Sequence, residues 1–396
     1  MNSIATEGLA LFDEHYRVGP EIEEPHAIVV RSAPVDTDDY PSLLAVARAG
    51  AGVNNITVAK ATGRGISVFN TPGANANAVA ELVFTMLGLR VRNIHEGMAF
   101  CQGLAGLDDA AISREVEARK KTFRGMELAG KTLGVLGIGK IGVRVANGGE
   151  QRHMRVLGFD PFPALENIHA LSPGVTLCRT PADVVRHADV LSLHLPLSDK
   201  SRGLVNAEFL ARLRPGAILI NYARGPIVDE TAVIAALESG RLGGYITDFP
   251  SARTLAHPAI LVTPHLGAST EESEEQCACL AARQLMAYLQ YGNVGRSVNF
   301  PTTESIPASN VHTRFIMINR DVPDMIGFAS HAIGSRGINI VSYLNESNGT
   351  VGYNIIDLEA AMPEELGAEI AAHPGVIRTR SIPATLFGPV PECSLP

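Results

Sequence analysis

The chain has 396 residues, of which 46% are hydrophobic and 19% charged, and its formal net charge at pH 7 is −8. This length exceeds the usual size of one hydrophobic core, so we expect two or three domains. The acidic balance argues against nucleic acid or an anionic membrane as a partner, and it means that any anionic substrate needs local cations.

Nothing in the sequence predicts export or a membrane span. Residues 1–15 lack the basic start and sustained apolar core of a secretory signal, and no stretch reaches about 18 uninterrupted apolar residues. The five cysteines include no C-x-x-C pair, and their odd number argues against a complete disulfide framework. We expect a cytoplasmic protein with reduced thiols, no membrane partner and no metal site.

The first 90 residues alternate between short strands and helices. We expect strands at 27–30 and 67–69, a short helix over 42–49, and a longer helix over 76–91, where the apolar spacing is helical. The stretch 115–127 is rich in Arg and Lys and is predicted to be an exposed connector.

A strand at 133–136 then runs into a glycine turn. Gly137, Gly139 and Gly142 fit G-x-G-x-x-G, with Lys140 and Ile141 opening the helix that follows. Bare backbone in such a turn can approach a pyrophosphate, and the helix points its N–H groups at the charge.

A second strand at 156–159 ends in Asp160, close to the roughly 20-residue offset of a ribose-binding carboxylate. A lone glycine motif is often an ordinary tight turn, but here strand, turn, helix, strand and acid come in order. The pattern predicts a dinucleotide site. It favours NAD over NADP, because Asp160 would repel a 2′-phosphate.

From residue 133 to 264 strands and helices alternate, which predicts a parallel sheet with helices on both faces. Further strands are expected at 190–193, 217–220, 245–247 and 260–262, with helices such as 182–187 and 231–239 between them. Chemistry-bearing residues are then expected beyond the carboxyl ends of the strands.

Three polar residues follow such strand ends. Arg224 follows 217–220, and its planar fork can hold a carboxylate; the alternative is a surface arginine in a loop. His265 follows 260–262 and is a candidate acceptor for the hydroxyl proton of an alcohol substrate. His194 is the competing candidate for this proton acceptor. We expect it instead to line the cofactor site together with Pro196.

A helix over 271–291 is stopped by Gly292, and the Pro-containing stretch 300–307 follows as a linker. Beyond it the pattern is βαββαβ, typical of a small ferredoxin-like unit. The expected strands and helices, in chain order, are 314–319, 324–335, 338–345, 351–358, 363–372 and 376–381.

The chain resembles the D-isomer-specific 2-hydroxyacid dehydrogenases, and within them a short bacterial branch that oxidises 3-phospho-D-glycerate and ends in an ACT domain. Besides the glycine turn, the motifs that carry the resemblance are spread over most of the chain: 30–32, 49–56, 69–78, 221–229 and 263–270.

The resemblance implies an α/β fold with two Rossmann-like domains, that is, doubly wound parallel sheets, and a ferredoxin-like ACT domain. The substrate domain would be discontinuous, at 1–90 and 268–300. The NAD-binding domain would span 91–267, and the ACT domain 311–390. A homodimer or higher homo-oligomer is also implied.

The implied activity is NAD-dependent oxidation of 3-phospho-D-glycerate to 3-phosphohydroxypyruvate, the first step of serine synthesis. By resemblance, Arg224 binds the substrate carboxylate and His265 is the acid/base. The residues implied for the phosphorylated substrate are Arg31, Ser32, Asn54 and Lys121, with Lys120 as an alternative to Lys121. Those implied for NAD, beyond the glycine turn, are Asp160, His194, Pro196, Ala223, Asp248 and Gly267.

The chain departs from the family in several places. Ala252 stands where a Glu usually orients the catalytic His, and Asp248 is the nearest carboxylate in sequence that could compensate. Only residues 2–5 are available for an opening strand. In the ACT segment, Asp321 and Asp324 replace an Asn and a Gly of the effector turn, so we doubt feedback by serine; Asp324 is instead expected to cap a helix.

Two alternatives stay open. One is a different D-2-hydroxyacid dehydrogenase, of the glyoxylate or hydroxypyruvate type. The other is a catalytically impaired NAD-binding regulator, motivated by Ala252.

Overall fold

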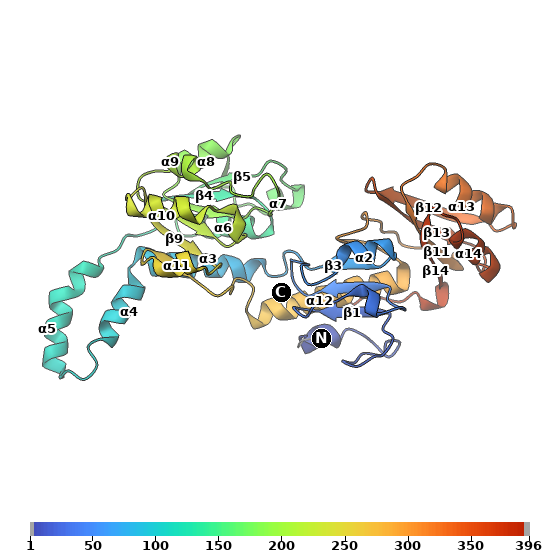
Figure 1. The fold of residues 1–396 in the computed structure, drawn as a ribbon, viewed down its shortest axis with the longest axis horizontal. Helices are drawn as coiled ribbons and strands as arrows, with labels where there is room; N and C mark the ends of the chain where they lie inside the picture. Colours follow the sequence, from blue (N-terminus) through green and yellow to red (C-terminus); the bar gives the residue numbers. More distant parts are fainter. Residues whose placement is uncertain (1–3, 392–396) are drawn as a thin grey trace. The chain divides into compact units, whose positions relative to one another are not determined.

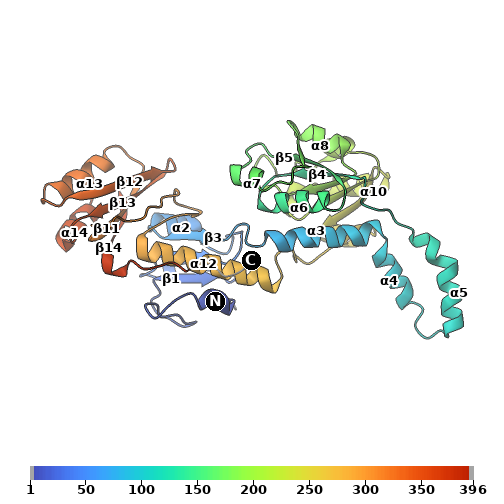
Figure 2. The ribbon, with the colours of Figure 1, turned by 180° about the vertical axis from the view of Figure 1, so that it is seen from behind.

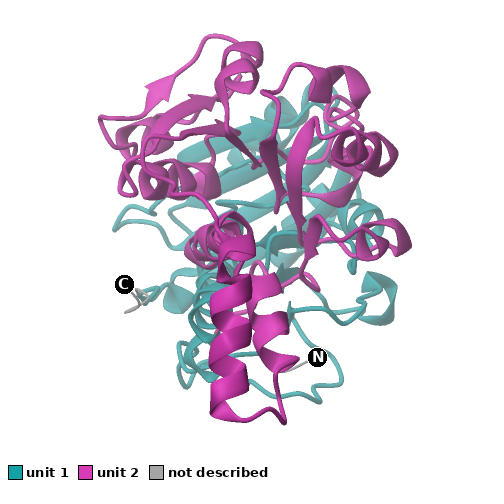
Figure 3. Cartoon of the chain, turned by 90° about the vertical axis from the view of Figure 1, so that its left-hand side faces the viewer, with its two compact units in different colours: residues 1–74, 271–396 teal, residues 75–270 magenta. Residues whose placement is uncertain are grey.

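The computed structural model describes residues 4–391 and contains three separate β-sheets (Figure 1). Contacts divide the chain into two compact units: Met1–Ala74 together with Glu271–Pro396, and Asn75–Thr270 (Figure 3). The first unit therefore joins the two ends of the chain. Among the described residues no helix has the length and apolar character that crossing a bilayer requires.

The first unit opens with helix α1 (Thr6–Leu9) and a three-stranded parallel sheet in the order β1-β2-β3. The strands are β1 (Ala27–Val30), β2 (Ala45–Arg48) and β3 (Ser67–Asn70), with η1 (Thr37–Asp39) and α2 (Val58–Gly63) between them. One face of this sheet packs with Ala61 of α2, and the other packs against α12 (Glu271–Tyr291). Helix α12 thus returns to the first segment.

Two expectations for this region are wrong. Residues 42–49 form no helix; instead, β2 is the central strand and pairs with both neighbours. Its alanines favour a helix locally, but two flanking parallel strands override that preference. The sheet also runs through its three strands without reversing order, so it is not doubly wound. The expected opening strand at 2–5 lies partly outside the described residues.

The C-terminal part of this unit has the element order βαββαβ, as expected. Its four antiparallel strands lie in the order β12-β13-β11-β14 (Figure 1). The elements are β11 (Thr313–Arg320), α13 (Met325–Gly334), β12 (Ile340–Ser347), β13 (Val351–Leu358), α14 (Glu364–Ala371), β14 (Val376–Pro383) and η4 (Ala384–Leu386). One sheet face packs on α13 and α14, and the other packs on α12.

The second unit is built on a seven-stranded parallel sheet in the order β10-β9-β8-β7-β4-β5-β6. Its strands are β4 (Thr132–Leu136), β5 (Arg155–Phe159), β6 (Thr176–Leu177), β7 (Val190–Leu193), β8 (Ala217–Asn221), β9 (Leu242–Thr247) and β10 (Ile260–Val262). The strand order reverses between β4 and β7, which is the switch point where open α/β sheets bind ligands. This is the predicted Rossmann-like sheet, with β6 as an additional edge strand.

Helices cover both faces of this sheet, and two separate clusters of buried side chains lie against them. The helices are α3 (Ala76–Val91), α6 (Lys140–Glu150), α7 (Leu165–His169), α8 (Pro181–His187), α9 (Ala207–Ala211), η3 (Gly225–Ile227), α10 (Glu230–Glu238) and α11 (Ala252–Ala256). Helix α3 packs against α6, where Phe84 lies over Gly148. For that reason α3 belongs to this unit, whereas the expected boundary at residue 91 assigned it to the first domain.

A helical arm leaves the second unit between α3 and β4 (Figure 2). It consists of α4 (Ile94–Gln102), α5 (Asp109–Arg119) and η2 (Lys120–Phe123), and no residue of these three helices is buried. The expected exposed connector at 115–127 is therefore exposed, but much of it is helical.

Candidate active site

The glycine turn has the geometry that a dinucleotide pyrophosphate requires. Gly137 has φ +96°, and a Cβ there would lie 2.3 Å from the carbonyl oxygen of His194. A Cβ on Gly142 would lie 1.9 Å from the carbonyl oxygen of Gly137, so the helix can approach the strand only without one. Gly139 has open space where its Cβ would point. Lys140 and Ile141 open helix α6 directly behind this turn.

Asp160 at the end of β5 is bound to this turn. Its Oδ2 accepts a hydrogen bond from the backbone N–H of Ile138 at 2.8 Å, and its Oδ1 accepts one from Phe162 N–H at 2.8 Å. Each carboxylate oxygen has a further lone pair for a ribose hydroxyl. The acid is thus placed beside the pyrophosphate turn.

His194 follows β7 and faces the same turn through its backbone. Its Nε2 lies 2.8 Å from Ser192 Oγ in a hydrogen bond, while its buried Nδ1 has no partner among the described residues. Burial lowers the pKa of His194 to about 3, so the imidazole stays neutral near pH 7. A neutral ring with an unused buried nitrogen suits a cofactor-lining role. Pro196 lies two residues on, and its carbonyl accepts from Ser201 Oγ.

The loop that carries Arg224 is held by the side chain of Asn221, the last residue of β8. Asn221 Oδ1 accepts from Ala223 N–H at 3.1 Å, and its Nδ2 donates to the carbonyl of Arg224 at 3.0 Å. Asn221 and Ala223 are buried, whereas Arg224 is exposed and its Nη1 donates to the Ala223 carbonyl at 2.7 Å. The amide fixes the backbone and leaves the guanidinium available to a ligand.

The loop that carries His265 is organised by Asp248, which follows β9. One oxygen of this buried carboxylate accepts from Thr263 Oγ1 at 2.5 Å and from Leu266 N–H at 2.8 Å. The other oxygen accepts from Gly267 N–H at 2.8 Å. Between these anchors His265 adopts φ +58°, a region that non-glycine residues rarely occupy. None of the three bonds reaches the imidazole, so the structure does not support compensation by Asp248 at the ring.

Phe249 connects the two loops. A Cβ on Gly225, next to Arg224, would lie 3.3 Å from the Phe249 side chain. On its other side, the Phe249 and His265 rings meet edge to face with centroids 5.3 Å apart. Strands β8, β9 and β10 are neighbours in the sheet, so Arg224, Asp248 and His265 leave adjacent carboxyl ends. The predicted arginine and histidine are thereby brought to one edge.

Ala252 is an exposed residue at the start of α11. Ser251 caps this short helix by accepting from Thr254 N–H at 3.1 Å, and its hydroxyl donates to Glu230 at 2.8 Å. Residue 252 therefore lies exposed at a capped helix start and offers no carboxylate.

The first unit, taken by itself, has a cationic edge of its own. Arg31 follows β1, and Arg48 ends β2 and donates from its Nε to the Arg31 carbonyl at 2.9 Å. The sequence did not predict Arg48 as a residue of this edge, because a helix was expected over 42–49 and Arg48 instead ends a strand. Asn55, not Asn54, ties this edge together by donating to the Ala33 carbonyl at 2.7 Å.

The remaining predicted substrate residues are exposed. Ser32 and Asn54 lie in the loops of this edge. Lys121 lies on η2 of the helical arm, and neighbouring Lys120 pairs with Glu117 at 2.5 Å. Nothing in the geometry of either lysine assigns it a ligand.

Comparison with known proteins places this site in a family. The model of the family described as "D-isomer specific 2-hydroxyacid dehydrogenase, NAD binding domain" matches residues 95–267. Over 94% of its length the chain is 31% identical to D-3-phosphoglycerate dehydrogenase of Escherichia coli strain K12, and 90% of that relative is covered. The chain belongs to the D-isomer-specific 2-hydroxyacid dehydrogenases. Curated relatives that it matches include D-3-phosphoglycerate dehydrogenases.

Two further relatives bear on the extent of the match. The D-3-phosphoglycerate dehydrogenase of Bacillus subtilis is 35% identical over 71% of this chain, but only 53% of that relative is covered. The chain thus spans about half the length of the first curated relatives that it matches. A solved structure of NAD+-bound 3-phosphoglycerate dehydrogenase from Entamoeba histolytica matches 69% of the chain and 82% of that structure, with 30% identity and a TM-score of 0.54.

The nucleotide-binding residues fit the cofactor that the family uses. The crowded Gly137 and Gly142, the open Gly139 and the carboxylate of Asp160 form a cradle for a pyrophosphate and a ribose. The buried, unpartnered Nδ1 of His194 lies at the neighbouring strand end. NAD is the cofactor of this domain.

Proposed function

We propose that this protein oxidises 3-phospho-D-glycerate to 3-phosphohydroxypyruvate, the entry reaction of serine synthesis. The observation that carries the proposal is the placement of Arg224 and His265 at the same edge of the sheet, after β8 and β10 on either side of β9, with Phe249 between their loops. Curated relatives that match the chain include phosphoglycerate dehydrogenases, and that of Escherichia coli strain K12 matches 94% of its length.

In the proposed mechanism, the guanidinium of Arg224 holds the substrate carboxylate and donates to the adjacent oxygen that becomes the ketone carbonyl. The imidazole of His265 accepts the hydroxyl proton. The glycine turn and Asp160 would hold NAD+, which would supply the acceptor for the hydride. Asp248 contributes indirectly, because its three hydrogen bonds hold the loop that presents His265. By resemblance, Arg31 and Ser32 hold the phosphate.

The division of the chain follows from the same reasoning. We assign the three-stranded sheet with α12 to substrate binding and the seven-stranded sheet to NAD. We assign the C-terminal βαββαβ unit to an ACT-type regulatory domain.

The turn before α13 carries two carboxylates, Asp321 and Asp324. Asp324 precedes α13 with φ +69°, a left-handed geometry that favours Gly. Its side chain makes no cap bond, so the expected helix cap is wrong. Asp321 accepts from Ser347 Oγ. Two carboxylates at this turn disfavour an effector carboxylate such as that of serine.

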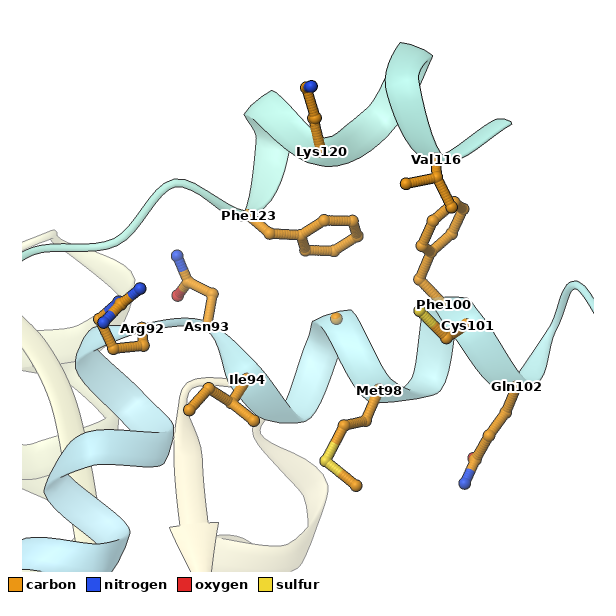
Figure 4. Close-up of a pocket in the computed structure, with 11 residues that line it drawn as sticks. Arg92, Asn93, Ile94, Met98, Phe100, Cys101, Gln102, Val116, Lys120 and Phe123 are labelled. Atoms are coloured by element: carbon orange, nitrogen blue, oxygen red, sulfur yellow. The ribbon is translucent and has the colours of Figure 1, made fainter. Parts of the chain in front are cut away.

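We also propose a homodimer formed through the helical arm, in the cytoplasm. Side chains of Phe100, Val116 and Phe123 lie between α4 and the α5–η2 segment, whereas Met98 points away from them (Figure 4). The arm also lines a shallow cavity of about 590 Å³. Apolar surface on a projecting arm suits contact with a second copy. Among the described residues no cysteine forms a disulfide, which fits a reducing compartment.

The test is NADH formation from 3-phosphoglycerate, compared with glycerate, lactate and 2-hydroxyglutarate. Removing the proton acceptor in His265→Asn is expected to lower kcat by about 10²–10⁴. Arg224→Gln is expected to lower kcat/KM for every acid that is turned over. The matched controls are His187→Asn and Arg253→Gln, at exposed positions outside the site.

Two outcomes would contradict the proposal, and each indicates a different function. Turnover of glycerate but not of its phosphate indicates a different 2-hydroxyacid substrate. Failure with every acid, combined with normal NADH binding, indicates an NAD-binding regulator, the function that Ala252 favours.

A further inference from the structure

The cation proposed for the substrate phosphate already has a partner within the chain. Nη1 of Arg31 lies 2.5 Å from Oε2 of Glu274, and the two side chains are 34% and 37% exposed. Glu274 belongs to the first turn of α12, the helix that covers one face of the small sheet. A carboxylate of the protein therefore occupies part of the fork that a substrate anion would use.

The pair is built into the fold, because both partners are held by their own elements. Arg31 follows directly from β1, and its carbonyl is fixed by Arg48. Helix α12 is anchored on the same sheet by Ala281 and Leu285, within the shared core. Burial raises the pKa of Cys277, one turn beyond Glu274, and the charges of Arg48 and Arg31 are close enough to oppose that rise. The start of α12 thus faces the cationic edge.

A phosphate that approaches Arg31 meets the negative charge of Glu274 at the same guanidinium. Either the phosphate displaces the carboxylate, or both anions share the fork and repel each other. Both routes weaken the binding of a phosphorylated substrate. A substrate with an uncharged hydroxyl at that end does not compete for Arg31 and is affected less.

We propose that Glu274 is a specificity-determining residue that serves as an internal counter-ion of Arg31 and competes with the substrate phosphate. This inference rests on the proposed function, because it takes Arg31 as the phosphate-binding residue. The charge of Glu274 lowers the preference for phosphoglycerate over glycerate below the level that Arg31 alone would give.

The experiment compares wild type with Glu274→Gln, which keeps the shape of the side chain and removes its charge. We expect the ratio of kcat/KM for 3-phosphoglycerate to kcat/KM for glycerate to rise roughly three- to tenfold, the range for a partly exposed ion pair. Glu272→Gln, an exposed residue of the same turn, is the matched control and should leave the ratio within about twofold. In an Arg31→Gln background, Glu274→Gln should have no effect on the ratio.

A second readout works without turnover. Binding of inorganic phosphate to the NADH-saturated full chain is measured by calorimetry, and Glu274→Gln should bind it more tightly than wild type only when Arg31 is present. An unchanged ratio together with unchanged phosphate binding overturns the inference, as does a gain that persists in the Arg31→Gln background. If no acid is oxidised but the calorimetric result holds, the proposed function fails while the counter-ion role stands.

Discussion

At the residue scale, the carboxylate that organises His265 acts on its backbone and not on its ring. Both oxygens of Asp248 are used by Thr263, Leu266 and Gly267, and the strained φ of His265 lies between those anchors. The ring itself contacts the Phe249 ring edge to face, and this apolar neighbour limits its orientation. The site is thus preorganised in geometry, but none of the three hydrogen bonds of Asp248 brings a carboxylate to the imidazole of His265.

Because no carboxylate contact is seen at the imidazole of His265 among the described residues, we predict that Ala252→Glu will raise the rate of 3-phosphoglycerate oxidation. The position is exposed and begins a helix, where an added carboxylate is tolerated and favoured by the helix dipole. A carboxylate that orients and stabilises the imidazolium should increase kcat by roughly ten- to a hundredfold. Steady-state kinetics with Ala252→Gln as the uncharged control would measure it. If Glu and Gln give equal rates, the missing charge is not what limits the enzyme.

At the element scale, helix α12 links the small parallel sheet to the C-terminal antiparallel sheet. Its end is contacted by three side chains of the latter: Tyr353 donates to the Gly292 carbonyl, Arg380 donates to the Tyr288 carbonyl, and Arg314 donates to the Tyr291 carbonyl. Arg314 is fully buried and also forms two hydrogen bonds, of 2.7 and 2.9 Å, with Asp357. Arg314 and Asp357 are opposite each other on β11 and β13, so this buried pair fixes the arginine that contacts the end of α12.

Breaking this pair should be costly. Arg314→Met leaves the charge of Asp357 buried and unpaired, and we expect a loss of about 3–5 kcal/mol in the free energy of unfolding. The double variant Arg314→Met/Asp357→Leu should recover much of that loss, because no charge is left behind. Urea denaturation of the full chain, followed by circular dichroism, measures both variants. Arg336→Met removes the exposed pair with Glu369 and should cost less than about 1 kcal/mol; equal losses in the two single variants would contradict a special role for burial.

At the scale of the whole molecule, the arm is the part of the second unit with the least support from its own chain. Helices α4 and α5 bury none of their residues, and two apolar side chains of the arm are exposed: Met98 on α4 and Leu107 between the two helices. Their intramolecular contacts are few and local, such as Phe100 with Phe123 and Arg119 over the Phe100 ring. A second copy of the chain would supply the burial that the arm lacks.

The dimer proposal predicts that an acid on this arm weakens self-association. Met98→Asp places a charge on exposed apolar surface of α4, and we expect the dissociation constant to rise roughly thirtyfold or more. Sedimentation equilibrium gives the value directly. Ile306→Asp makes the same change at an exposed linker residue and should leave association unaltered. A monomeric wild type, or a Met98→Asp variant as dimeric as wild type, rules out the arm as the interface.

Local sequence was sufficient to predict much of the nucleotide-binding unit and the element order of the C-terminal segment. The glycine turn, the strand ends before Arg224 and His265, and the βαββαβ order of the last segment are short-range patterns, and the elements lie where those patterns predict them. Such patterns work because a buried parallel strand needs a continuous apolar run, and because a turn against a backbone carbonyl needs glycine.

The tertiary structure decided the rest, because it depends on contacts between residues far apart in the chain. Residues 42–49 have helical composition, and only pairing with two distant strands makes part of them a strand that places Arg48 at an edge. The three partners of Asp248 and the pairing of Arg31 with Glu274 likewise join separate elements. Sequence spacing carries no information about which charge faces which. Once the chain has folded, that pairing is set by sheet order and helix packing.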